Sequence, residues 1–142
     1  MQSKYCLPIA KSSKAEISSD ISKMLNDYGF FEVWLDYVED LDNEFIDELL
    51  EKYESKLVFV TRRKNLEKPK LDALFRKNLI EKLNGYKCYI DLDIYNQKGD
   101  LITAKNSNLI VSYHNYSETP DNETLDKIVS EIDQLTSAIK PS

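Results

Sequence analysis

The single histidine of the chain, His114, is the residue best suited to proton transfer, because an imidazole titrates near neutral pH. It lies in the segment LIVSYHNYSETP, where an apolar run ends and a turn-forming run begins. A lone histidine at a strand end is more often structural than catalytic. The residues that share its end of the molecule must therefore decide between the two interpretations.

Three further residues that could take part in chemistry lie at the ends of apolar runs. Arg63 and Glu67 follow one run, and Lys140 ends another. The carboxyl ends of parallel strands are where α/β proteins assemble their sites. Each residue also has an ordinary interpretation as part of a solvated loop or surface, so only the joint pattern favours a functional site.

Polar and apolar residues alternate on three of the runs, and successive side chains of a strand point to opposite faces. The residues that share a polar face are Glu32, Trp34 and Asp36 in EVWLDYV, Asp91 and Asp93 in YIDLDI, and Ser112 and His114 in VSYHN. A sheet covered by helices on both sides needs two apolar faces, since an unpaired buried carboxylate is costly. A barrel interior that opens into a polar site explains the alternation better.

Short apolar runs alternate with helical patterns along the chain. The expected strands are residues 4–10, 32–38, 56–62, 86–94, 108–115 and a last stub at 137–140. Apolar stripes at helical spacing begin at Ile17, Phe45, Leu71 and Leu125, and residues 96–107 have room for only one or two turns. This alternation predicts one α/β domain over residues 1–142 with a parallel sheet.

Two architectures fit that pattern, an open doubly wound sheet and part of a (β/α)8 barrel. Length favours the open sheet, because a full barrel needs roughly 200 residues or more. The polar strand faces favour the barrel.

Composition excludes several classes of function. The net charge of −6 disfavours nucleic acid or an anionic membrane surface as a partner. No apolar run approaches the ~20 residues of a membrane span, and the N-terminus lacks the apolar region of a secretory signal. Two cysteines in apolar runs suit a cytoplasmic protein with reduced thiols.

Four segments in order resemble the type I 3-dehydroquinate dehydratases, the Schiff-base lyases of the shikimate pathway. SYHNYSETP is similar to the family's Ser-Tyr-His-Asp-Phe followed by Thr-Pro, and EVWLDYV to its Glu-Leu-Arg-Leu-Asp strand. FVTRRKNLE resembles its Thr-x-Arg-x-x-x-Glu segment, and YIDLDI its Val-Asp-Ile-Glu strand. The resemblance runs from CLPIA to AIK and implies a parallel (β/α)8 TIM barrel.

By position, the resemblance implies roles for the candidate residues in converting 3-dehydroquinate to 3-dehydroshikimate without metal or other cofactor. Lys140 matches the lysine that forms the imine, His114 the catalytic histidine, and Glu67 the carboxylate that assists it. Glu32 and Arg63 match residues that hold the substrate hydroxyls. An imine of the substrate ketone is a better electron sink than the ketone, which explains the need for a lysine.

The sequence departs from the family pattern at three places. Trp34 stands where the family usually has arginine, and an indole can stack on the substrate but cannot supply a guanidinium. Lys68-Pro69 replace two glycines, and Asn115 replaces an aspartate.

The chain stops two residues after Lys140, whereas the family continues through two more strands. We therefore expect an incomplete barrel of about six strands with unpaired edges. Either the sequence is truncated, or another chain or a second copy in a homodimer covers the edges, or the chain is a non-catalytic remnant serving as a binding or scaffold domain. An open α/β signalling module that is phosphorylated on Asp36 or Asp91 is the alternative from another class.

Overall fold

The computed structural model describes residues 5–63, 67–104, 108–114 and 120–139. For residues 135–139 it describes the backbone alone. Five strands form one parallel sheet: β1 (Cys6–Ile9), β2 (Phe30–Trp34), β3 (Leu57–Val60), β4 (Tyr89–Asp93) and β5 (Asn108–Ser112). The helices are α1 (Lys14–Met24), α2 (Asn43–Tyr53), α3 (Ala73–Leu83), α4 (Lys98–Thr103) and α5 (Asn122–Ile139), with short 3-10 turns at Leu35–Tyr37 and Glu54–Lys56. The four predicted stripes fall on α1, α2, α3 and α5, although Leu71 lies before the start of α3, and α4 has the short length expected of residues 96–107.

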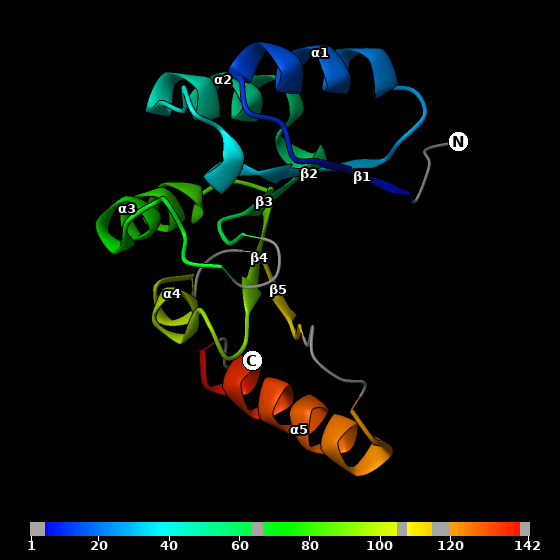
Figure 1. Cartoon of the computed structure of the whole chain (residues 1–142), viewed down its shortest axis with the longest axis vertical. Helices are drawn as coiled ribbons and strands as arrows, with labels where there is room; N and C mark the ends of the chain where they lie inside the picture. The colour runs from blue at the N-terminus through cyan, green and yellow to red at the C-terminus, as the bar shows by residue number, and fades with distance from the viewer. Residues whose placement is uncertain (1–4, 64–66, 105–107, 115–119, 140–142) are drawn as a thin grey trace.

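The order of the strands decides between the two architectures. Each strand pairs in parallel with the next one in sequence, giving β1-β2-β3-β4-β5 without a reversal. A doubly wound sheet reverses its strand order at a switch point, which places helices on both faces. Here the helices lie along one side of a curved sheet, from α1 and α2 through α3 and α4 to α5 (Figure 1). The fold is therefore a barrel-type α/β arc that does not close, and it lacks the architecture that the signalling-module alternative requires.

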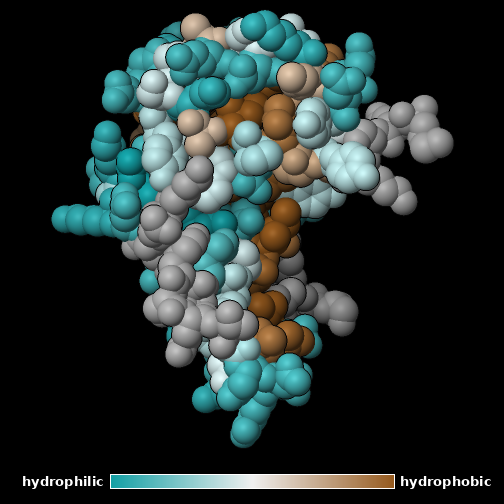
Figure 2. Space-filling view, turned by 45° about the vertical axis from the view of Figure 1, so that its right-hand side comes forward, coloured by the Kyte–Doolittle hydropathy of each residue, from teal (hydrophilic) through white to brown (hydrophobic). Residues whose placement is uncertain are grey.

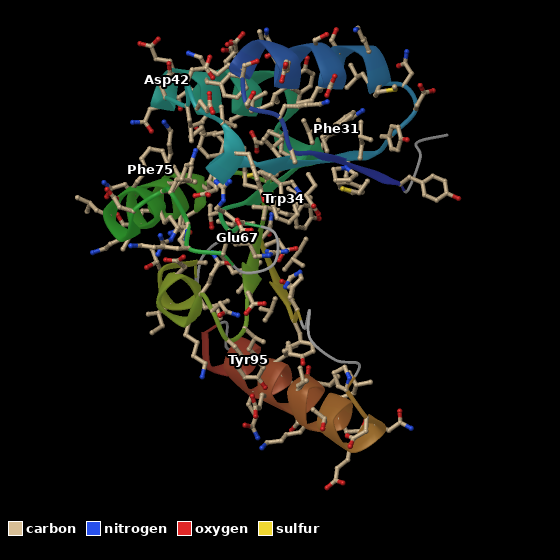
Figure 3. All side chains as sticks on the ribbon, in the orientation of Figure 1. Phe31, Trp34, Asp42, Glu67, Phe75 and Tyr95 are labelled. Atoms are coloured by element: carbon tan, nitrogen blue, oxygen red, sulfur yellow. The ribbon has the colours of Figure 1, made fainter. Side chains whose placement is uncertain are left out.

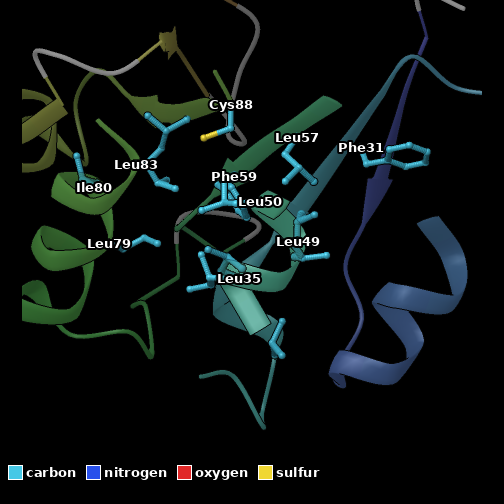
Figure 4. Close-up of a cluster of buried hydrophobic side chains, with 14 of the residues drawn as sticks. Phe31, Leu35, Leu49, Leu50, Leu57, Phe59, Leu79, Ile80, Leu83 and Cys88 are labelled. Atoms are coloured by element: carbon cyan, nitrogen blue, oxygen red, sulfur yellow. The ribbon is translucent and has the colours of Figure 1, made fainter. Parts of the chain in front are cut away.

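The hydrophobic core lies between the helices and the outer face of the sheet. Phe31 and Val33 of β2 and Leu57 and Phe59 of β3 are completely buried. Figure 4 shows leucine and isoleucine side chains of α2 and α3 converging on Leu57 and Phe59. Because fully burying such a side chain stabilises the fold by about 1.5–3 kcal/mol, the outer face anchors the sheet. The inner face is then free to carry polar residues.

Short polar side chains fix where the helices begin. Ser13, Asp42 and Asp72 cap α1, α2 and α3, each accepting a hydrogen bond from the backbone N–H three residues later. Asp121 accepts one from Thr124 N at 2.8 Å at the start of α5. Such caps satisfy amide groups that have no partner within the helix.

Two of the predicted strands are wrong in extent. Residues 137–139 of the expected stub are helical, because α5 continues through Ile139, and the sheet has five strands in the described chain rather than about six. Neither glycine nor proline interrupts the sequence between Leu125 and Ile139, so nothing ends the helix earlier. The strand expected at 32–38 stops at Trp34, and Asp36 lies on the 3-10 turn that follows.

Within the described residues, no helix combines the length and the apolar character needed to cross a membrane.

Candidate active site

The side of the sheet that faces away from the helices carries the candidate site. Alternate residues of all five strands line an open hollow of about 370 Å³ there: Cys6, Phe30, Glu32, Val58, Tyr89, Asp91 and Ile110. Figure 2 turns the right-hand side of Figure 1 toward the viewer and shows apolar surface running along the molecule between hydrophilic regions. The predicted alternation is confirmed within the strands, where Val33, Ile90 and Leu92 lie in the core, whereas Asp36 and His114 lie beyond the ends of β2 and β5.

His114 follows β5 at its carboxyl end and contacts a charged group through each ring nitrogen. Its Nδ1 lies 2.9 Å from Asp93 Oδ2, and its Nε2 lies 2.9 Å from Arg62 Nη2. A guanidinium has only N–H donors, so Nε2 accepts from Arg62 and Nδ1–H donates to Asp93. The partners therefore assign the tautomer, and Nε2 is the basic atom of the ring.

Asp93 ends β4 and is almost completely buried beneath the imidazole. Its Oδ1 accepts hydrogen bonds from Tyr95 N at 2.9 Å, Asn96 N at 2.8 Å and Asn96 Nδ2 at 2.9 Å. Burial alone would raise the pKa of this carboxyl, but the hydrogen bonds from His114, Asn96 and Tyr95 outweigh it, and the pKa lies below its ordinary value. Asp93 is therefore an ionised carboxylate that orients the histidine.

Arg62 lies beside the histidine and is only 6% exposed. Its Nη1 donates to Asp91 Oδ1 at 3.0 Å, and its guanidinium carbon lies 5.3 Å from the centre of the Trp34 ring. Ser112 Oγ donates to the same Asp91 oxygen at 2.6 Å. A continuous polar network therefore runs from Ser112 through Asp91 and Arg62 to His114.

The predicted substrate-binding residues Glu32 and Trp34 are joined by a hydrogen bond on β2. Trp34 Nε1 donates to Glu32 Oε1 at 2.7 Å. The indole is buried, with the Arg62 guanidinium over its ring, whereas Glu32 is half-buried on the wall of the hollow. The structure thus places both residues on the inner face.

Arg63, the third predicted substrate-binding residue, is tied to the turn after β2. Its Nη1 donates to Asp36 Oδ2 at 2.8 Å and to Asp36 O at 3.2 Å, and its guanidinium stacks on Tyr37 at 4.3 Å. The hydrogen bond with Asp36 raises the pKa of Arg63. Asp36 is buried and also accepts from Leu71 N at 2.8 Å, so this pair fixes the loop after β2 to the segment before α3.

Glu67, the predicted assistant of His114, lies near Arg63. Its Oε2 is 3.7 Å from Arg63 Nε, and its side chain is 62% exposed. Figure 3 shows Glu67 and Trp34 close to the centre of the molecule. In the described part of the chain, the carboxylate bonded to His114 Nδ1 is that of Asp93. A direct role for Glu67 stays a prediction.

Lys140, the predicted imine-forming residue, lies outside the described residues. The residue before it, Ile139, ends a helix and not the strand that was expected. The assignment of Lys140 stays a prediction that depends on the sequence match alone.

The prediction of site residues missed Arg62 and Asp93. The alternation along the expected strand 56–62 could have identified Arg62. Every second residue of a strand points to the same face, so Val58, Val60 and Arg62 share one face. Asp93 was recognised as sharing a face with Asp91 but was given no role. Among the described residues, no cluster of three His, Cys, Asp or Glu side chains could hold a metal ion.

These features define a class: an unclosed parallel β/α barrel with an imidazole–carboxylate pair at the carboxyl ends of its strands. The chain matches the type I 3-dehydroquinase family over residues 5–140, and it belongs to that family.

One solved structure with a similar fold is the 3-dehydroquinate dehydratase from Aquifex aeolicus VF5. The match has 22% sequence identity and a TM-score of 0.72, and it covers 95% of this chain. The chain spans 63% of the length of that protein. No curated protein sequence matches the chain.

Proposed function

We propose that the protein is a 3-dehydroquinate dehydratase, a carbon–oxygen lyase that forms 3-dehydroshikimate through a lysine imine in the shikimate pathway. The observation that carries the proposal is the state of His114, whose Nδ1–H is held by ionised Asp93 and whose Nε2 is the acceptor atom of the ring, 2.9 Å from Arg62 Nη2. An oriented imidazole with a basic Nε2 is what proton abstraction beside a carbonyl needs. Membership of the type I 3-dehydroquinase family supports this choice of reaction.

The chemistry follows from the electronic demand of the substrate. The neutral Lys140 amine attacks the ketone, and loss of water gives a protonated imine that can accept electrons. His114 Nε2 removes the proton from the carbon beside the imine, and the electron pair moves to the imine nitrogen. The resulting enamine expels the β-hydroxyl, which takes the proton from His114 and leaves as water. Hydrolysis of the imine releases the product and restores the lysine.

We further propose that Glu32, Trp34 and Arg63 bind the substrate and that Glu67 assists His114. The position of Glu32 and Trp34 on the inner face supports their part. The hydrogen bond from Arg63 to Asp36 supports the part of Arg63, because it holds the guanidinium in place as a hydrogen-bond donor for the substrate. No metal or organic cofactor takes part in this scheme.

We also propose that residues 1–142 act as one barrel domain on a small molecule in the cytoplasm, with two copies forming a homodimer. The charge of −6 supports the absence of nucleic acid from the scheme. Among the described residues no further strand pairs with the outer edge of β5, and this supports association between copies.

Borohydride reduction in the presence of 3-dehydroquinate, followed by peptide mass mapping, tests the imine directly. We expect one stable adduct on Lys140, because reduction converts the imine to a secondary amine. The adduct should disappear in Lys140→Ala and persist in Lys127→Ala, which removes an exposed lysine of α5. In His114→Ala the adduct should still form while dehydration slows by about 100-fold or more. An unmodified wild-type protein would contradict the proposal.

A second candidate function is a non-catalytic binding domain of the same family. It is favoured by the helical conformation of residues 137–139, where a strand was expected. This function predicts that 3-dehydroquinate binds, as measured by isothermal titration calorimetry, while borohydride traps no adduct.

A further inference from the structure

The guanidinium of Arg62 contacts His114 through one nitrogen and Asp91 through another, and its third nitrogen makes no hydrogen bond within the described residues. Nη1 bonds to Asp91 at 3.0 Å and Nη2 to His114 Nε2 at 2.9 Å. The third nitrogen, Nε, is buried and has no acceptor among the described residues. A buried N–H without an acceptor normally destabilises a fold, so such a group indicates a missing partner.

The present position of Arg62 also blocks the base. An arginine remains protonated and can only donate, so Nε2 cannot take a proton from a substrate while Nη2 occupies its lone pair. Catalysis by His114 therefore requires Nη2 to find another acceptor. Asp91 and the Trp34 ring still hold the guanidinium, so a small shift is enough to release Nε2.

The two nitrogens in question form one edge of the guanidinium. Nε–H and Nη2–H lie side by side and point in nearly the same direction, which is the geometry that binds both oxygens of a carboxylate. In 3-dehydroquinate the carboxylate and the departing hydroxyl are on the same carbon, next to the carbon that loses its proton. A carboxylate on this edge of Arg62 would therefore place the acidic carbon beside Nε2.

We propose that Arg62 is the carboxylate-binding residue of the site, and that substrate binding transfers its Nη2 from His114 Nε2 to the carboxylate. This inference rests on the proposed function, because it takes 3-dehydroquinate as the substrate. It also explains how a protein of net charge −6 could bind an anionic substrate, because the anion would contact the buried, fixed guanidinium of Arg62. In this proposal Trp34 positions Arg62, because the guanidinium stacks on the indole ring.

Nitrogen-15 NMR of the imidazole tests, without substrate, whether Arg62 Nη2 caps Nε2 by donating a hydrogen bond to its lone pair. Because the chain has one histidine, the protein gives a single set of ring signals. In Arg62→Met we expect the Nε2 signal to move toward that of an uncapped lone pair while the Nδ1 signal stays. Arg62→Lys should also move the Nε2 signal, because one ammonium cannot reach Asp91 and His114 with the geometry of a guanidinium. This second variant keeps a charge beside Asp91 if Arg62→Met does not fold. An Nε2 signal identical to that of the wild type in the folded variants would overturn the capping.

Ligand titration followed by the same signals tests the carboxylate. The probes are 3-dehydroquinate and 3-hydroxycyclohexanone, which keeps the β-hydroxyketone but lacks the carboxylate. We expect Arg62→Met to weaken 3-dehydroquinate binding by about tenfold or more, as loss of a charged hydrogen bond would, and to leave 3-hydroxycyclohexanone binding almost unchanged. Arg76→Met is the matched control, since Arg76 also pairs with an aspartate, Asp100, at 2.9 Å but lies on α3 among the helices.

The two proposals fail in different ways. If the wild type responds to 3-dehydroquinate and Arg62→Met binds it equally well, the carboxylate assignment is overturned and the proposed function stands. If the wild type shows no response to 3-dehydroquinate, the proposed function is overturned together with the carboxylate assignment.

Discussion

At the scale of single residues, the site depends on one oriented imidazole. Asp93 uses both carboxylate oxygens, one for His114 and one for three hydrogen bonds from Tyr95 and Asn96. Those three bonds fix the carboxylate before it meets the histidine, so the ring has one tautomer and one orientation. The arrangement leaves Nε2 as the acceptor atom of the ring, which Arg62 contacts at 2.9 Å.

Asp93→Asn should separate the orienting role from simple packing. The side-chain amide can present its NH2 group to Nδ1 and favour the wrong tautomer, so we expect dehydratase activity to fall about 100-fold or more with little change in shape. Asp133→Asn, on the exposed face of α5, should leave the activity unchanged. Steady-state kinetics on both variants checks this, and full activity in Asp93→Asn would contradict the role.

The lowered pKa of Asp93 also has a consequence for stability. A carboxyl whose pKa is lower in the folded than in the unfolded protein stabilises the fold above about pH 4, and this contribution disappears as the pH falls through the folded pKa. The difference in melting temperature between wild type and Asp93→Asn should therefore be largest near neutral pH and shrink below about pH 4. Thermal unfolding by circular dichroism between pH 7 and pH 3 measures it, and a difference that grows on acidification would contradict the sign.

At the scale of elements, Gln97 connects the strands that carry the site. Its Oε1 accepts from Asp93 N at 3.0 Å, and its Nε2 donates to Thr61 Oγ1 at 2.9 Å. Gln97 lies just before α4, so one buried amide joins the carboxyl ends of β3 and β4 to the first turn of that helix. The strand ends that present Arg62 and Asp93 are thereby held in register.

Gln97→Met should break this connection without changing the volume of the side chain much. Two buried groups, Asp93 N–H and the Thr61 hydroxyl, lose a partner, so we expect the free energy of unfolding to fall by about 2 kcal/mol or more. Urea unfolding followed by circular dichroism gives the value. Gln134→Met, at an exposed position of α5, should change it by less than about 0.5 kcal/mol. Equal effects in the two variants would contradict the bridging role.

At the scale of the whole molecule, the sheet is covered on its outer face and open on its inner face. The inner hollow draws apolar side chains from four strands, among them Phe30, Val58, Tyr89 and Ile110, and Ile110 is 38% exposed. Figure 2 shows the resulting apolar surface on this side. An open apolar hollow of this kind can bind a small apolar molecule in a protein that is otherwise firmly packed.

An anilinonaphthalene sulfonate dye should therefore bind the folded protein at the hollow. We expect Ile110→Glu to reduce the dye fluorescence several-fold, and Ile102→Glu, at an exposed position of α4, to leave it nearly unchanged. Near-ultraviolet circular dichroism should show fixed aromatic packing in all three proteins, which excludes a molten state as the source of the signal. Equal fluorescence in the two variants would contradict binding at the hollow.

The sequence by itself determined the elements and the faces of the strands. Helical spacing placed four of the five helices, and alternation in YIDLDI and VSYHN put Asp91, Asp93 and His114 on one face, because these signals depend only on neighbouring residues. Length and residue chemistry disagreed on the choice between an open sheet and a barrel, and the resemblance to the dehydratase family favoured the barrel. Helix ends were harder, because the continuation of α5 through Ile139 depends on the absence of a stop signal.

Only the tertiary structure decided which strands are neighbours and which side chains meet. The sequential strand order settled the barrel type. The partners of His114 come from two other strand ends, 52 residues away at Arg62 and 21 residues away at Asp93. Spacing along the chain cannot encode such contacts, because they arise when curvature of the sheet brings separate carboxyl ends together around one small space.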